Sequence, residues 1–246
     1  MPEVCIPSYQ RPHIISCYTL MFLYRQNYPV DKITIFVASE YEKGLYEEQV
    51  PRTLYGKIVV GVLGIRQQRN FITDYYPEGT LLLCLDDDVK DIKFLDPTYT
   101  FDNLVNYGVT CLETSGLFGI MPNSDGRKLN IHTTYHLAFI LGSFHIRRNH
   151  KDIRITVPDK DDFEMTILYF KKYKSVVRFQ GAGVCTRYGK TEGGLQQQDR
   201  NIKQQIAISY LVGTYPEYVK IIQKNSGTDL LLNWRATENT SEVSRA

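Results

Sequence analysis

The sequence predicts an α/β fold built on a doubly wound, mostly parallel sheet. In the first half, apolar runs of strand length alternate with helical stretches, and the links between them are short. This alternation is typical of strand–helix–strand units with right-handed crossovers. Beyond residue 90 the pattern is less regular, which predicts a mixed sheet. We expect one domain over residues 1–235, divided at 1–90 and 91–235, and a disordered polar tail at 236–246.

The elements of the first half follow from apolar periodicity. A short buried strand is expected at Val4–Pro7, and a helix near Ile14–Arg25. Runs rich in β-branched residues then alternate with polar helical stretches. In chain order they predict a strand, helix, strand, helix and strand at Lys32–Ala38, Tyr41–Gln49, Lys57–Leu63, Gly64–Tyr75 and Leu81–Leu85.

The second half is led by one clear amphipathic helix at Asp161–Tyr173, with acids in its first turn. The stretch Gly181–Gly194 is rich in Gly and Thr, which predicts a mobile loop. The remaining helices are expected at Phe101–Thr114, Gln196–Tyr210 and Glu217–Gln223, and the remaining strands at Gly116–Met121, Tyr135–Ile146 and Ser175–Gln180.

Composition indicates a soluble globular protein, with 43% hydrophobic and 23% charged residues. No signal-peptide pattern opens the chain and no apolar run reaches spanning length, so we expect a cytoplasmic protein that does not enter a membrane. The cysteines are scattered and never have CxxC spacing, which predicts reduced thiols without a zinc site or disulfides. They are Cys5, Cys17, Cys84, Cys111 and Cys185.

The run Leu81–Leu85 ends in three consecutive carboxylates, Asp86, Asp87 and Asp88. Adjacent acids repel one another, so the arrangement is costly unless a cation or hydrogen-bond donors compensate. In open α/β sheets, ligands collect at the carboxyl ends of the strands. Hard oxygen ligands suit Mn²⁺ or Mg²⁺ bound with a phosphate-bearing substrate. The alternative is a solvated acidic turn.

Two further segments are expected at the same edge of the sheet. The loop after the first strand offers a stacking face and a charged fork, and it contributes Pro7, Ser8, Tyr9 and Arg11. The helix after the third strand presents polar groups one turn apart, which can reach one pyrophosphate, and it contributes Arg66, Arg69 and Asn70. Together with the acids they predict a site for a nucleotide diphosphate and a metal ion.

With these motifs, most of the chain resembles glycosyltransferases of the GT-A fold, which bind nucleotide sugars through an Asp-any-Asp motif after the fourth strand. The resemblance implies that Pro7-Ser8-Tyr9 holds the nucleobase and that Arg66, Arg69 and Asn70 steady the diphosphate. Asp88 is the expected direct metal ligand, and Asp86 faces ribose or sugar hydroxyls or joins Asp88 on the metal. Asp87 is a candidate for either role, because the acids are consecutive. A lid over the donor is expected from Lys190, Gly193 and Gly194.

The acids at the start of the 161–173 helix fit the catalytic-base segment of inverting members of this family. Asp162 is the expected base, and Asp161 is the second candidate. Such a carboxylate would accept the acceptor hydroxyl proton while that oxygen attacks the anomeric carbon. The alternative is that either acid merely caps the helix.

The combined pattern is similar to a phage and eukaryotic subgroup associated with thymine and methylcytosine oxidases. This resemblance implies UDP-glucose as donor, 5-hydroxymethylpyrimidine DNA as acceptor and, for a viral protein, the host cytoplasm. Residues 145–204 carry 13 Lys and Arg against 7 Asp and Glu, which favours a polyanionic partner. The expected acceptor and DNA contacts are Arg147, Arg148, Lys151, Arg154 and His136. A solvated helix face is the alternative.

Three other functions stay open. The same chemistry could serve a glycan, lipid or protein acceptor. A nucleotidyltransferase would also use a doubly wound sheet with Mg²⁺, but it is expected to have a Gly-rich loop after the first strand, where Pro7–Pro12 has no glycine. A non-catalytic DNA-binding module conflicts with the triple acid, because carboxylates repel phosphate unless a cation intervenes. Nothing in the sequence implies a protein partner.

Overall fold

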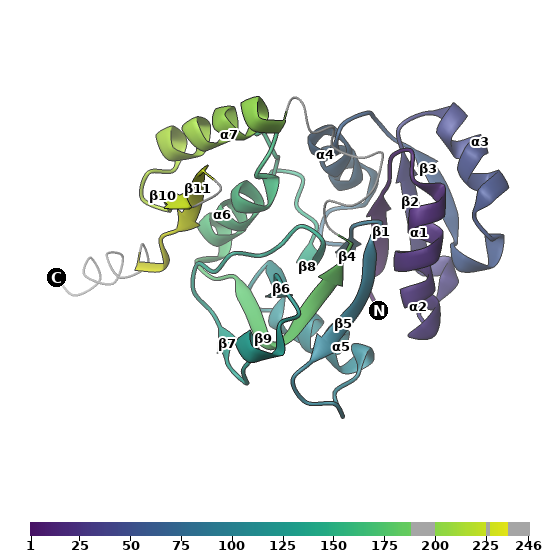
Figure 1. Cartoon of the computed structure of the whole chain (residues 1–246), viewed down its shortest axis with the longest axis horizontal. Helices are drawn as coiled ribbons and strands as arrows, with labels where there is room; N and C mark the ends of the chain where they lie inside the picture. The colour runs from purple at the N-terminus through teal and green to yellow at the C-terminus, as the bar shows by residue number, and fades with distance from the viewer. Residues whose placement is uncertain (188–199, 225–226, 236–246) are drawn as a thin grey trace.

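The computed structural model describes residues 1–187, 200–224 and 227–235 of the chain. Within these ranges, nine strands form one sheet in the order β3-β2-β1-β4-β8-β6-β9-β5, with β7 also paired to β9 (Figure 1). The strands of this sheet are β1 Glu3–Pro7, β2 Ile33–Val37, β3 Lys57–Val60, β4 Leu81–Leu85, β5 Val89–Phe94, β6 Leu117–Met121, β7 Thr133–Thr134, β8 Phe144–Arg148 and β9 Val177–Thr186. A separate antiparallel hairpin consists of β10 Val219–Lys224 and β11 Gly227–Leu232.

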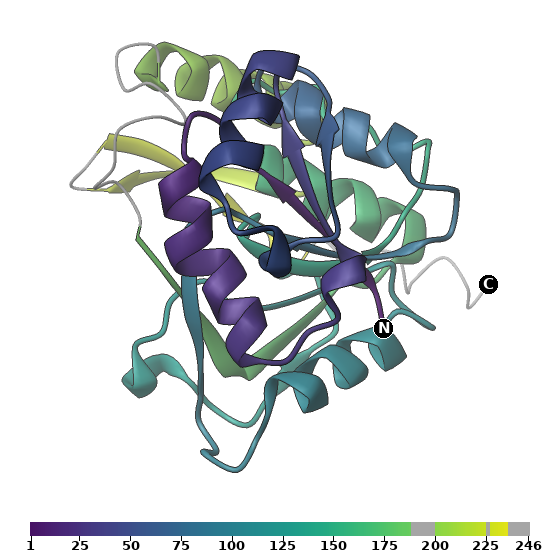
Figure 2. The same cartoon turned by 90° about the vertical axis from the view of Figure 1, so that its right-hand side faces the viewer.

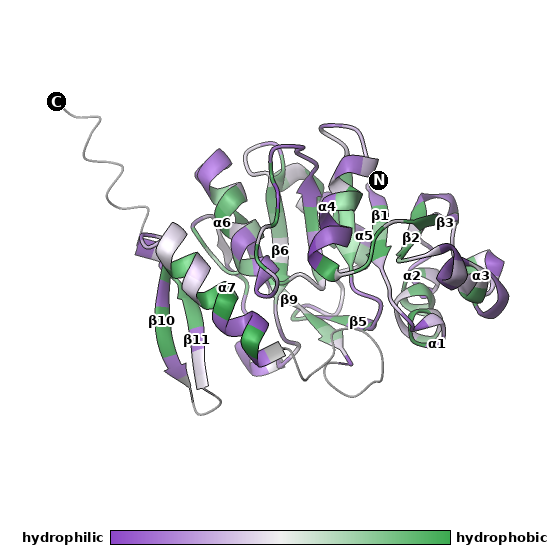
Figure 3. Cartoon of the chain, turned by 90° about the horizontal axis from the view of Figure 1, so that it is seen from above, coloured by the Kyte–Doolittle hydropathy of each residue, from purple (hydrophilic) through white to green (hydrophobic). Residues whose placement is uncertain are grey.

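Helices cover both faces of the sheet. The first helical segment joins α1 Pro12–Ile15, a π-helical turn at Ser16–Leu20 and α2 Met21–Arg25; Figure 2 shows it in purple in front of the sheet. The other α-helices are α3 Glu40–Gln49, α4 Ile65–Tyr75, α5 Phe101–Cys111, α6 Asp161–Tyr173 and α7 Arg200–Thr214. Hydrophilic residues colour much of α3 at the outer edge (Figure 3). No helix in the described ranges is both long and apolar enough to span a membrane.

The predicted α/β fold is confirmed, and the sheet changes character where it was expected to. Strands β3, β2, β1 and β4 are parallel neighbours, whereas β8 joins β4 in the antiparallel sense. Alternate residues of the central strands face opposite layers. Val4 and Leu83 pack with α2 and α5, while Cys5 and Cys84 pack with α4. The carboxyl ends of β1 and β4 therefore lie side by side.

Several predicted elements are wrong in the second half. The expected strand at Tyr135–Ile146 begins only at Phe144, because apolar residues before it, such as Ile140, are buried by contact with β6. The expected helix at 217–223 is strand β10, and β5 was not predicted at all. Residues 181–186 of the expected loop belong to β9, and its remainder from 188 on lies outside the described residues, as does the predicted tail.

The end of α4 is tied to β8 by Asn149, which is fully buried. Its Nδ2 atom donates hydrogen bonds to the carbonyls of Thr73, Tyr76 and Pro77, at 3.0, 2.9 and 3.1 Å. Asn149→Ala is expected to lower the free energy of unfolding by about 1–3 kcal/mol, because buried acceptors lose their donor. Urea denaturation measures this, with the exposed Asn201→Ala as control. Equal losses in both variants would contradict the assignment.

Candidate active site

The triple acid lies in the turn between β4 and β5, and its middle residue points toward the loop after β1. Asp87 is 6% exposed, and its Oδ2 accepts a hydrogen bond from Ser8 Oγ at 2.7 Å. Its Oδ1 is 3.3 Å from Arg11 Nη1. Burial raises the pKa of Asp87 to about 6, while the Ser8 hydrogen bond and Arg11 oppose that rise. These contacts favour a positioning role for Asp87, Ser8 and Arg11.

The same loop is fixed from a second side by α3. The hydroxyl oxygens of Ser8 and Tyr46 are 2.7 Å apart, and Tyr46 accepts a hydrogen bond from the Arg11 amide at 3.0 Å. Glu42 accepts the amide of Gln10 at 2.7 Å. Pro7 and Tyr9 are half-buried in this loop. Tyr46 and Glu42 escaped the sequence analysis, because only the fold brings α3 beside the loop.

The π-helical turn contributes Thr19, which sequence reasoning also missed. Its Oγ1 donates to the Asp86 carbonyl at 2.7 Å and accepts from the Val89 amide at 2.9 Å. The side chain thereby spans the triple-acid turn and fixes its backbone. π-Helical turns inside helices are frequent at functional sites. No local pattern in the sequence marks this one.

Carboxylates from both halves of the chain meet at Arg69 of α4. Its Nε is 2.8 Å from Asp161 Oδ2, and its Nη2 is 3.6 Å from Asp86 Oδ1. Burial raises the pKa of Asp86 to about 6; Asp88 and Asp161 add to that rise, and Arg69 opposes it. Burial also raises the pKa of Asp88. The triple acid and the first turn of α6 therefore meet at one guanidinium.

Gly142 makes room for this guanidinium. A Cβ atom at position 142 would lie 2.5 Å from Arg69 Nη2, closer than side chains tolerate. The Asp86 amide also donates to the carbonyl of the neighbouring Ser143, at 3.3 Å. The segment before β8 thus packs directly against both partners of the Arg69–Asp86 pair.

Asp162 is the second residue of α6 and lies next to Asp161 in this cluster. Helix α6 begins at Asp161, and its N-cap position is Lys160, so neither acid is the cap residue. Asp162 Oδ1 accepts the Phe163 amide at 2.9 Å. Burial raises the pKa of Asp162 to about 7; Asp161 adds to that rise and Arg69 opposes it. A carboxyl that titrates near neutral pH suits proton transfer.

Two residues expected to steady a diphosphate instead hold the segment before α6. Asn70 exchanges hydrogen bonds with the Ile155 backbone, at 2.8 and 2.9 Å, and Arg66 Nη1 donates to the Thr156 carbonyl at 2.9 Å. The fully buried Glu164 accepts the Thr156 amide at 2.6 Å. These contacts favour a structural role for Asn70 and Arg66 in the placement of the α6 acids.

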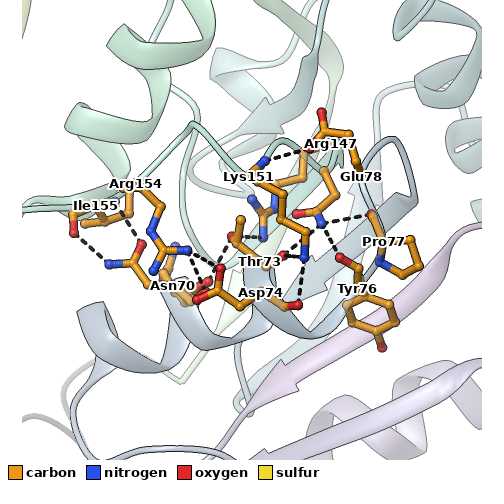
Figure 4. Close-up of polar contacts among 12 residues, drawn as sticks. Asn70, Thr73, Asp74, Tyr76, Pro77, Glu78, Arg147, Lys151, Arg154 and Ile155 are labelled. Atoms are coloured by element: carbon orange, nitrogen blue, oxygen red, sulfur yellow. Dashed lines mark hydrogen bonds and ion pairs between the residues drawn. The ribbon is translucent and has the colours of Figure 1, made fainter.

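Three of the basic residues expected on a DNA-binding surface contact α4 and the residues after it (Figure 4). Arg147 is 6% exposed and donates to Thr73 Oγ1 at 3.1 Å, so its predicted phosphate contact is wrong. Lys151 Nζ donates to the carbonyls of Thr73 and Asp74, at 2.8 and 2.7 Å. Arg154 Nη1 is 2.5 Å from Asp74 Oδ1. These side chains bind α4, because β8 and the segment after it pack along that helix.

The other predicted site residues are spread over the structure. Arg148 is half-buried on β8. The His136 ring lies 6.1 Å from the Trp234 ring, centroid to centroid, near the end of the described chain. Lys190, Gly193 and Gly194 lie outside the described residues.

The acids of the β4–β5 turn fit a metal that arrives with its substrate. Among the described residues, no group of three or more His, Cys, Asp or Glu side chains could hold a metal ion. Mg²⁺ commonly takes one or two carboxylates and completes its shell with phosphate and water oxygens. Asp86 and Asp88 are the residues that would supply such a donor set. Burial disfavours their ionised forms and raises their pKa values, a cost that a bound cation would offset.

No protein family model matches the chain, and a search of curated proteins finds no match. Among solved structures, a mycobacterial protein is similar over 94% of this chain and 82% of its own, with a TM-score of 0.56 and 9% identity. That likeness shows the fold alone.

Two enzymes are similar at a lower level. A mannosyltransferase from Pyrobaculum calidifontis, solved with GDP-Man and Mn²⁺, has a TM-score of 0.45, 16% identity and coverage of 76% of this chain and 57% of its own. A 4-diphosphocytidyl-2C-methyl-D-erythritol synthase from Anaerococcus prevotii has a TM-score of 0.45, 11% identity and coverage of 85% and 96%. At these TM-scores, neither likeness bears on the chemistry of this chain.

Proposed function

We propose that the chain is a metal-dependent glycosyltransferase of the GT-A type, which takes a sugar from a nucleotide donor. One observation carries the proposal: Asp86, in the triple acid, and Asp161, in the first turn of α6, both contact Arg69. These contacts bring the triple acid and the first turn of α6 together at the carboxyl edge of one sheet, where substrates bind in this fold class. This supports a metal-binding pair in the triple acid with a base beside it in α6.

Each group has a role that its surroundings favour. Asp88 and Asp86 would hold Mn²⁺ or Mg²⁺, which when bound supplies charge neutralisation for the departing diphosphate. The loop with Pro7 and Tyr9 would hold the nucleotide, and Arg11 would position Asp87 beside it. Asp162 would accept the proton of the attacking hydroxyl, giving an inverting reaction.

A nucleotidyltransferase remains the second candidate, because it would use the same acids for its metal. The surroundings of Asp162 favour glycosyl transfer. A phosphate nucleophile is already ionised at neutral pH, whereas a hydroxyl nucleophile needs a base, and Asp162 has its pKa raised to about 7 by burial. The loop after β1 also lacks the glycines expected of nucleotidyltransferases.

The finer proposal names UDP-glucose as donor and a 5-hydroxymethylpyrimidine in DNA as acceptor. It depends on the sequence resemblance alone, because Arg147, Lys151 and Arg154 bind α4. Incubation with UDP-glucose, Mn²⁺ and hydroxymethylcytosine duplex should add the mass of one hexose to the DNA. If the DNA stays unmodified while a glycan, lipid or protein is labelled, the DNA acceptor is wrong. The assignment as a glycosyltransferase would still stand.

Donor binding provides the direct test of the site. Thermal shift with a panel of nucleotide sugars is expected to show stabilisation that requires both nucleotide and Mn²⁺. Asp88→Asn should abolish that joint shift, since an amide is a poorer metal ligand. Asp91→Asn is the matched control, because Asp91 is exposed on β5. Loss of the shift in both variants, or in neither, would contradict the metal assignment.

A further inference from the structure

Two cysteines far apart in the sequence lie in contact beneath the proposed site. Cys5 of β1 and Cys84 of β4 are directly opposite each other in the parallel pairing, and their Sγ atoms are 3.2 Å apart. They are 1% and 9% exposed. The spacing of neighbouring strands, about 4.8 Å, falls within the range of Cα separations that a disulfide bridges.

A third polar side chain extends this row. His145 of β8 is directly opposite Cys84, so Cys5, Cys84 and His145 occupy one line across three adjacent strands. His145 is 2% exposed, and its Nδ1 atom has no hydrogen-bond partner among the described residues. An imidazole beside a thiol can take the proton that the thiol loses on reaction.

All three side chains line one small cavity. Its volume is about 30 Å³, and Arg147 and Asp86 also contribute to its wall. This is enough room for a molecule of about the size of water. The cavity therefore joins two touching thiols, a proton acceptor and space for a small reagent.

We propose that Cys5 and Cys84 form a redox modification site, which a peroxide small enough to enter the cavity converts into a disulfide. One sulfur attacks a peroxide oxygen, the O–O bond breaks, and a sulfenic acid forms with release of the first water. The second sulfur attacks the sulfenic sulfur, the S–S bond forms, and a second water leaves. Two electrons pass from the sulfurs to the peroxide, and the two thiol protons end in the waters.

The disulfide would join β1 and β4 just before Pro7 and Asp86. Formation of the disulfide does not depend on the proposed function. Only an effect of the disulfide on donor binding would depend on it. The two proposals can therefore fail separately. A linked pair in a protein that binds no nucleotide sugar would leave this inference standing.

Peptide mapping tests the inference. Protein with Cys17→Ser, which removes an exposed thiol, is treated with hydrogen peroxide, quenched, unfolded, alkylated and digested. Mass spectrometry should then show a Cys5–Cys84 linked peptide that is lighter by two hydrogen atoms and is lost on reduction. Cys111→Ser, at another buried cysteine, should leave the linkage intact, and Cys84→Ser should remove it.

The wild-type protein supplies the control for the oxidant, through oxidation of the exposed Cys17. If Cys17 is oxidised while Cys5 and Cys84 are both recovered alkylated, the inference is wrong. Recovery of either as sulfinic acid without a linked peptide would overturn it as well. Should Cys84→Ser fail to fold, the wild-type and Cys111→Ser maps still decide the question.

Discussion

Asp162→Asn is expected to lower the rate of sugar transfer about 10²- to 10⁴-fold, the usual contribution of a general base. Donor affinity should be unchanged, because the expected donor contacts lie in the β1 loop and the β4–β5 turn. Single-turnover kinetics at saturating donor measures the first quantity, and calorimetric titration of the donor measures the second. Asp102→Asn is the matched control: Asp102 is also the second residue of its helix, but it is exposed.

Retained turnover in Asp162→Asn would remove Asp162 from the base role. The remaining possibilities would then be Asp161 as base, or a retaining mechanism in which no protein group takes the acceptor proton. The anomeric configuration of the transferred sugar, compared with that of the donor, separates these two outcomes. A loss of donor affinity equal to the loss of rate would instead point to a disturbed site.

The pH dependence of transfer offers an independent check on Asp162. Burial raises its pKa to about 7, so the ionised form that can accept a proton is lost as the pH falls below 7. The rate is expected to rise through pH 7 and then level off. The contribution of Asp162 to the free energy of unfolding changes with pH in the opposite direction to the rate. The folded state favours the protonated form, so this contribution to stability is present at low pH and is lost as pH rises toward 7. A rate that is flat between pH 6 and 8 would contradict the assignment.

Arg69→Met is expected to lower the free energy of unfolding by less than the roughly 3–5 kcal/mol that breaking a fully buried ion pair costs, because the Asp86 side chain is 37% exposed. Asp161 and Asp86 would lose the guanidinium that lies 2.8 and 3.6 Å from them. Urea denaturation at pH 8 measures the loss. It should shrink at low pH, where the carboxyls are protonated.

The control for Arg69 is Arg66→Met on the same helix, which removes one partly exposed hydrogen bond to Thr156. Its expected cost is about 1 kcal/mol or less. If Arg69→Met does not fold, Arg69→Lys can be used instead. It keeps the positive charge but not the planar guanidinium, so it should give an intermediate loss in the free energy of unfolding. Equal stabilities of the Arg69 and Arg66 variants would show that the Arg69 cluster contributes little to folding.

Elements with a strong local pattern could be predicted from the sequence. The strand Leu81–Leu85 and the helix Asp161–Tyr173 have the predicted bounds, because one is a continuous apolar run and the other has strong helical periodicity. Prediction failed at Val219–Lys224, whose strand form depends on pairing with β11, and at β5, whose partner β9 is distant in the chain.

The site shows the same division. The position of Asp86 at the carboxyl end of β4 follows from the apolar run before it, whereas only the family resemblance suggested a place for Asp161 in the same site. The burial of Arg147 depends on β8 lying between β4 and β6, which no local pattern reveals. Charge alone therefore placed Arg147 on a surface, whereas the fold buries it. Likewise, Thr19 and Tyr46 are ordinary residues until the fold places them beside the acids.

The close contact between Gly142 and Arg69 restricts which residues relatives of this chain can have at these two positions. Any larger residue at position 142 would require the end of the Arg69 side chain, which contacts Asp161 and Asp86, to move. Positions 69 and 142 should therefore covary: relatives that keep arginine at one should keep glycine at the other. Relatives with neither arginine at position 69 nor glycine at position 142 are expected to hold the acids of the site with a different cationic side chain, or to lack the activity.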